Sequence, residues 1–177
     1  VQDQKNVFLL SFINIIYHKS KMTNKPQLMI HNYLDKLATS KHISNSTIFY
    51  GPNLDNIYSI MIDFSKKLIN TSTNIPIETN DELQEPFVDL IIINPESSSI
   101  KINLISTLQQ RIRYGSNSKT PCIVILHNIQ RLTKSSSNAL LKSIEEPPPN
   151  TVFLLSTQNK ATVLETIASR SQSYFIP

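Results

Sequence analysis

The chain has 177 residues, of which 40% are hydrophobic, and this length and composition fit one globular domain with a substantial core. Its formal net charge is +4 and its sequence pI is about 9.2, a mild basicity that favours a lysine-rich solvated surface over a dedicated nucleic-acid face. No run of Lys and Arg is dense enough to form a polybasic arm, and the single cysteine, Cys122, excludes an internal disulfide framework.

One apolar run, VFLLSFINIIY, lies near the amino terminus at positions 7–17. It has about half the length of a membrane-spanning helix, and Asn14 interrupts it. Asp3 precedes the run, where a signal peptide would carry basic residues. We therefore predict that residues 1–21 are an extension outside the functional fold, that residues 22–177 form one core domain, and that the chain has no membrane partner.

The next elements have the layout of a phosphate-binding loop. A predicted helix at 27–40 is followed by a short strand at 47–50, the dipeptide Gly51-Pro52 and a second predicted helix at about 56–70. A strand that enters a glycine turn and then a helix is typical of such a loop, whose pattern is G-x-x-x-x-G-K-[ST].

The residues that the loop would use are missing. Counted from Gly51, the second glycine position holds Asn56, the lysine position Ile57 and the hydroxyl position Tyr58. Glycines let backbone N–H groups approach the phosphates, the lysine neutralises them and the hydroxyl reaches magnesium. We predict that this loop, Pro52 included, survives as architecture only and holds no cofactor.

The middle of the chain predicts a surface connection at 71–86, a buried strand at 88–94 and an amphipathic helix after it. Arg111 and Arg113 end that helix as solvated charges, with a DNA-facing role left open. No cysteine lies between Gly51 and Pro121, and the four histidines (positions 18, 31, 42 and 127) are far apart. The sequence therefore predicts no metal site.

A second buried strand is predicted at 122–126, and His127 and Asn128 follow it directly. In an ATPase of this layout an acidic residue would stand here to hold magnesium. A helix at 135–146, with Leu140, Leu141 and Ile144 on one face, ends at three consecutive prolines that cannot continue it. The strand and the helix are thus predicted without the metal-holding acid.

Two more strands, at 152–156 and 174–176, complete the predicted sheet. Between them, a helix at 161–168 is expected to point Val163, Leu164 and Ile167 inward. Five strands that alternate with helices predict an α/β fold in which a five-stranded parallel sheet is flanked by helices.

The run at 138–148, NALLKSIEEPP, resembles the NALLKxLEEPP signature of bacterial clamp-loader subunits of the AAA+ superfamily. The resemblance implies an AAA+ P-loop-type core, here with a degenerate nucleotide site, and likens Thr157 to the sensor 1 residue. Family members continue into lid and collar domains, and we expect residues 22–177 to correspond to the core domain without them, as a fragment or as a shortened subunit. Glu145 and Glu146 point about 100° apart on a helix, so they are not an acid–base pair, and the resemblance implies contacts with an adjoining subunit.

A second segment, TIASRSQ at 166–172, resembles the T-I-x-S-R-C-Q segment of the same family, with Ser171 in place of the usual cysteine. The resemblance implies that Arg170, between Ser169 and Ser171, is an arginine finger that reaches the ATP of a neighbouring subunit. An arginine suits this role because its planar, permanently charged group can meet two phosphate oxygens and stabilise the transition state.

The chain keeps Arg170 but lacks the phosphate-loop residues, and in this combination it resembles the delta-prime subunits of bacterial DNA polymerase III clamp loaders. The resemblance implies a cytoplasmic subunit of the DNA polymerase III holoenzyme without intrinsic ATPase activity, which supports loading of the sliding clamp onto primed DNA. Its implied partners are the gamma/tau ATPase, the delta subunit, the sliding clamp and, through the complex, primer–template DNA. Two alternatives stay open: an active gamma/tau-type ATPase, and a free-standing basic DNA-binding module on the same fold.

Overall fold

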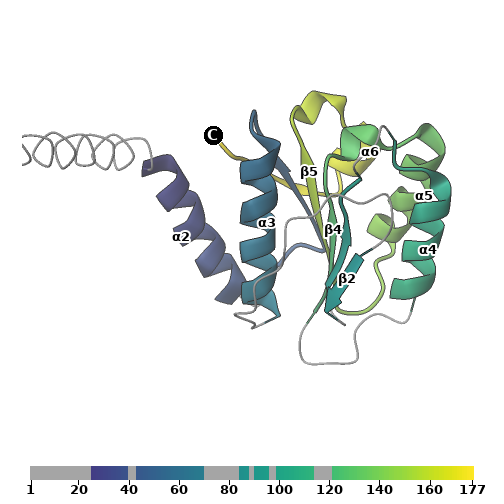
Figure 1. The fold of residues 1–177 in the computed structure, drawn as a ribbon, viewed down its shortest axis with the longest axis horizontal. Coiled ribbons are helices and arrows are strands. Elements are labelled where there is room, and N and C mark those ends of the chain that lie inside the picture. Colours follow the sequence, from purple (N-terminus) through teal and green to yellow (C-terminus); the bar gives the residue numbers. More distant parts are fainter. Residues whose placement is uncertain (1–24, 40–42, 70–83, 88–89, 96–98, 114–120) are drawn as a thin grey trace, which may run out of the picture.

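A computed structural model describes residues 25–39, 43–69, 84–87, 90–95, 99–113 and 121–177, and in this part of the chain helices cover both faces of one sheet (Figure 1). The predicted extension at 1–21 lies outside the described residues. In chain order the elements are α2 (Lys25–Thr39), β1 (Ser46–Tyr50), α3 (Leu54–Leu68), β2 (Gln84–Phe87), β3 (Leu90–Ile93), α4 (Ile102–Ile112), β4 (Cys122–Leu126), the 3-10 turn η1 (Ile129–Arg131), α5 (Lys134–Glu145), β5 (Thr151–Thr157), the 3-10 turn η2 (Lys160–Thr162), α6 (Glu165–Ala168) and β6 (Gln172–Phe175).

The strands form one sheet in the order β2-β3-β4-β5-β1-β6. Every neighbouring pair from β3 to β6 is parallel, which confirms the predicted five-stranded parallel sheet flanked by helices. β1 lies between β5 and β6, so the first parallel strand of the chain is bordered by the last two. Parallel strands end at the same edge of a sheet, and the segments that follow β1, β4 and β5 are therefore brought together.

Alternate residues of the parallel strands face two separate hydrophobic cores. Phe49 and Ile92 pack with α2 and α3 on one face, whereas Ile48 and Ile93 pack with α4, α5 and α6 on the other. All four side chains are buried. A strand that is covered on both faces reads as a continuous apolar run, which is why runs such as CIVIL predict it well.

Two predicted segments differ from the structure in their kind of secondary structure, and others differ only in their bounds. The surface connection expected at 71–86 is wrong at its end, because residues 84–87 form β2, antiparallel to β3 at the sheet edge. Residues 70–83 lie outside the described part. β2 has four residues and contains Pro86, which an edge strand tolerates, so its sequence carries no strand signal of its own.

The helix expected at 161–168 is broken in two, since η2 is followed by extended backbone at Val163 and Leu164 before α6 begins. The Asn159 side chain accepts a hydrogen bond from Ala161 N (2.9 Å) and closes η2 as a separate short turn. Ile167 is buried as expected, but Leu164 is 42% exposed, so its predicted inward orientation is wrong.

Candidate functional site

The carboxyl ends of β1, β4 and β5 meet at one edge of the sheet, where an α/β protein of this kind holds its ligand. Gly51 follows β1 and donates its backbone N–H to the carbonyl oxygen of Thr157 at the end of β5 (3.2 Å). His127 follows β4 and donates its backbone N–H to Ile93 O (2.8 Å). The phosphate-loop and metal-acid positions predicted from the sequence are therefore brought together.

The turn after β1 is short, because α3 begins at Leu54, two residues before the predicted start. Asn53 caps the helix: its Oδ1 accepts from Asn56 N (3.0 Å) and its backbone oxygen accepts from Ile57 N (3.1 Å). A phosphate-binding loop needs such N–H groups to point at the anion. Here two of them are bonded within the chain, at positions where the loop would present its second glycine and its lysine.

The side chains at these positions fill the core. Ile57 and Tyr58 are buried, and both belong to the cluster between α3 and the sheet. Gly51 lies against the carboxyl-terminal residues, so closely that an added Cβ would come within 1.9 Å of Ile176 O. Pro52 is exposed. The chain itself therefore occupies the space around this turn.

The metal-acid position holds a buried, hydrogen-bonded histidine. His127 Nδ1 lies 2.8 Å from Ser156 Oγ, and its ring centroid is 4.9 Å from that of Tyr58. Asn128 adopts a left-handed backbone (φ 57°), and its N–H donates to the same serine oxygen (2.8 Å). Burial lowers the pKa of His127 to about 4; nearby Asp55 opposes this shift and Arg131 adds to it. The imidazole is therefore neutral at pH 7, and this position supplies no carboxylate.

Acidification is expected to destabilise the fold through His127. Its pKa of about 4 in the folded state lies below the ordinary 6.5, so the unfolded chain binds more protons between these values. The stabilisation is complete above pH 6.5 and is lost as the pH falls toward 4, which makes the free energy of unfolding roughly 2 kcal/mol lower at pH 5 than at pH 7. Urea denaturation at several pH values measures this slope.

The matched variant for that measurement is His127→Asn, which removes the titrating group. We expect this variant to have a lower free energy of unfolding at pH 7, because a buried hydrogen bond is lost. We also expect that free energy to change clearly less between pH 7 and pH 5. A pH slope identical to that of the unchanged chain would contradict the assignment to His127.

Thr157, the residue likened to sensor 1, is buried and bonded locally. Its Oγ1 donates to Asn159 O (3.2 Å) and accepts from Asn159 N (3.3 Å). These bonds hold the turn that leads into η2.

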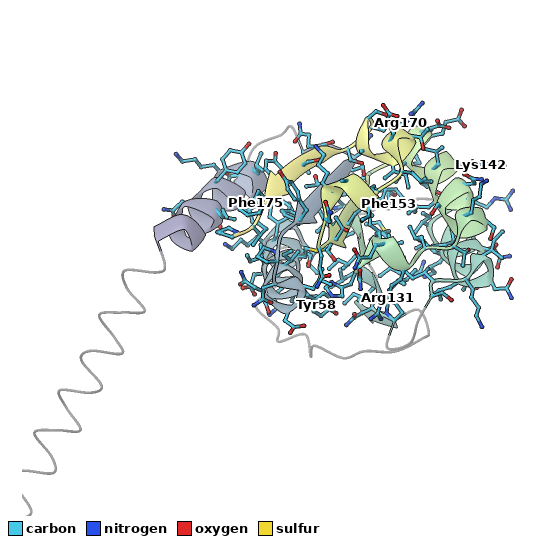
Figure 2. All side chains as sticks on the ribbon, turned by 90° about the horizontal axis from the view of Figure 1, so that it is seen from above. Tyr58, Arg131, Lys142, Phe153, Arg170 and Phe175 are labelled. Atoms are coloured by element: carbon cyan, nitrogen blue, oxygen red, sulfur yellow. The ribbon has the colours of Figure 1, made fainter. Side chains whose placement is uncertain are left out.

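Arg170 lies at the opposite edge of the sheet. It directly precedes Ser171, whose Oγ bonds Ser46 Oγ at the start of β1 (2.7 Å), whereas Gly51 follows the end of β1. A strand of this length separates the two places by roughly 15 Å. Figure 2 shows Arg170 and Tyr58 on opposite sides of the molecule. Arg170 therefore cannot serve the phosphate-loop turn of its own chain.

The guanidinium of Arg170 is held at the surface. Its Nη2 lies 2.9 Å from Glu145 Oε1, and its Nη1 donates to Thr166 O (3.1 Å) and to Ser169 Oγ (3.4 Å). Ser171 Oγ also donates to Ile167 O (2.8 Å), so this serine fixes the turn. Glu145 is the partner that sequence reasoning missed, because no sequence spacing joins the end of α5 to the end of α6.

Metal-ligating side chains do not cluster in the described residues: no group of three or more His, Cys, Asp or Glu is placed to hold an ion. Across the same ranges, no helix combines the length and the apolar character that crossing a membrane requires.

The described residues thus form an α/β core, in which helices flank five parallel strands, a glycine turn lies at one edge of the sheet and an arginine turn at the other. The model of the family described as "DNA polymerase III, delta subunit" matches residues 26–177. The chain belongs to this family.

Individual relatives are similar over part of their length. A DNA polymerase III subunit delta' of Haemophilus influenzae is 36% identical over 73 residues, which cover 41% of this chain and 22% of the relative. The delta' subunit of Bacillus subtilis is 32% identical over 85 residues (48% and 26%), and a gamma subunit of Buchnera aphidicola is 34% identical over 87 residues (49% and 23%). The matched segments therefore span about a quarter of these relatives.

A solved structure supports the fold. A gamma subunit-related protein of Thermotoga maritima superposes with a TM-score of 0.67 at 24% sequence identity, over 82% of this chain and 45% of that protein.

Proposed function

We propose that this chain is a non-catalytic clamp-loader subunit that presents Arg170 to the ATP site of a neighbouring subunit. In this role it supports loading of the sliding clamp onto primed DNA, in the cytoplasm. Its proposed partners are a gamma/tau-type ATPase, a delta subunit, the sliding clamp and, through the assembled complex, primer–template DNA.

The observation that carries the non-catalytic part is the burial of Ile57 at the lysine position of the phosphate loop. Its side chain has 0% exposure, and its backbone N–H is bonded to Asn53. A triphosphate needs a cation and unpaired N–H groups at this turn, and magnesium needs an acid where His127 stands neutral. In this chain a buried isoleucine, a bonded N–H group and a neutral histidine stand in place of these groups.

The placement of Arg170 supports the role in trans. The residue lies at the sheet edge away from its own turn, and its side chain is 44% exposed. Arginine fingers that a second protein supplies are an established way to stabilise the charge of a phosphoryl-transfer transition state.

Calorimetric titration of the isolated chain with magnesium and ATP tests the non-catalytic part. We expect no binding heat under conditions where a gamma/tau-type ATPase of the same organism binds, because the turn at Gly51 is filled by the chain. Binding that disappears when the residues of this turn are altered would overturn the proposal.

A second candidate is an active gamma/tau-type ATPase, because the relatives include gamma and tau subunits as well as delta' subunits. A tau subunit of Escherichia coli is 32% identical over 93 residues, so overall similarity does not separate the two roles. The buried Ile57 and the neutral His127 support the non-catalytic role, and the same titration decides between the candidates.

A further inference from the structure

Arg170 is exposed, but its guanidinium is already engaged by groups of its own chain. Glu145, in the last turn of α5, lies 2.9 Å from the Arg170 guanidinium, and two contacts from α6 hold the other side of the group. A guanidinium that is bonded to a carboxylate is electrically balanced. The ion pair with this carboxylate must break before the guanidinium can bind the oxygens of a triphosphate on another protein.

The electrostatics of the helix end favour the pair in the isolated chain. The carboxyl end of a helix carries partial negative charge, which disfavours Glu145 there and attracts a cation. Glu146 follows at the C-cap position and adds a second negative charge. Arg170 is thus drawn to the end of α5 by a carboxylate and by the helix itself, and the acidic surroundings oppose the approach of a triphosphate.

The ion pair is nevertheless weak enough for Arg170 to exchange Glu145 for another anion. The side chains of Arg170 and Glu145 are 44% and 38% exposed, and ion pairs between exposed groups change an equilibrium by at most about five-fold. The pair borders an open groove of about 570 Å³ that Ser44, Asn45 and Pro147 also line. This open space lets the guanidinium rotate away from Glu145.

We propose that Glu145 is a positioning residue that competes with the neighbouring subunit's triphosphate for Arg170. The inference rests on the proposed function, since Glu145 would control how readily Arg170 reaches the ATP site of the neighbouring subunit. In the isolated chain Glu145 keeps the guanidinium against α5; in the assembled complex the triphosphate, with its greater charge, displaces the carboxylate.

The test titrates a gamma/tau-type ATPase of the same organism with this chain and follows ATP turnover. Glu145→Gln keeps the size of the side chain and removes its charge. We expect the half-saturating concentration of the chain to fall by up to about five-fold at low salt while the maximal turnover stays the same. The difference narrows at high salt, because screening weakens an exposed pair.

Glu146→Gln is the matched control. It removes the same charge one residue away, from a side chain that the structure does not pair with Arg170, and we expect a smaller shift. The decisive comparison is a double-mutant cycle: in an Arg170→Ala background, Glu145→Gln should change nothing.

Each outcome separates the two proposals. Turnover that is unaffected by Arg170→Ala overturns the proposed function and this inference with it. A loss with Arg170→Ala, combined with a Glu145→Gln variant that is inert, slower, or equally effective without Arg170, overturns the inference alone.

Discussion

Replacing Arg170 by alanine is expected to lower ATP turnover at the neighbouring site by on the order of 10³-fold, while the chain stays folded and associated. The fold survives because the ion pair with Glu145 is exposed and contributes little to stability. Turnover falls because the charge that spreads over the transferred phosphoryl group loses the cation that this chain supplies, while the magnesium ion and the loop lysine of the ATPase remain. The measurement is single-turnover ATP hydrolysis by a complex with one ATPase subunit beside this chain.

Two variants calibrate that loss. Arg170→Lys keeps the charge but not the planar, two-pronged donor, so we expect an intermediate rate. Arg111→Ala removes an exposed arginine at the end of α4 and should leave the rate unchanged when DNA is absent. Full activity of Arg170→Ala in a complex whose assembly is verified would remove this residue from the mechanism.

The parallel strands and long helices were predictable because their signals are local. Strands covered on both faces read as apolar runs, and α5 ends where three prolines forbid its continuation. The structure places α5 at Lys134–Glu145, within one residue of the prediction at each end. β2 was missed because its pairing with β3 depends on a neighbour rather than on its own four residues.

The candidate site was predictable in its residue types but not in its contacts. Counting from Gly51 located Ile57 and Tyr58, yet only the fold shows that α3 begins early enough to bury them. Similarly, the serine-arginine-serine segment singled out Arg170, whereas its pairing with Glu145 arises from the meeting of α5 and α6. Hydrogen bonds and ion pairs between distant segments have no signature in a single sequence.

Under the proposed function, the filled turn also makes the absence of a nucleotide site difficult to reverse by a single substitution. Ile57→Lys restores the residue that a phosphate loop requires, but at a position with 0% exposure inside the core cluster of α3. We expect it to lower the free energy of unfolding by roughly 4 kcal/mol, because a lysine buried without a partner must either keep its charge out of water or lose its proton. Chemical denaturation followed by circular dichroism measures the change.

Ile57→Val is the matched control, since it removes one methyl group, adds no charge and should cost only about 1 kcal/mol. The alternative for the lysine is to extend its four-carbon stem past the turn at Gly51 and place the ammonium in water. In that case the variant would stay nearly as stable as the unchanged chain and would bind ATP. Such a result would show that the turn still has room for a phosphate, and that one side chain, rather than the packing around it, excludes the nucleotide.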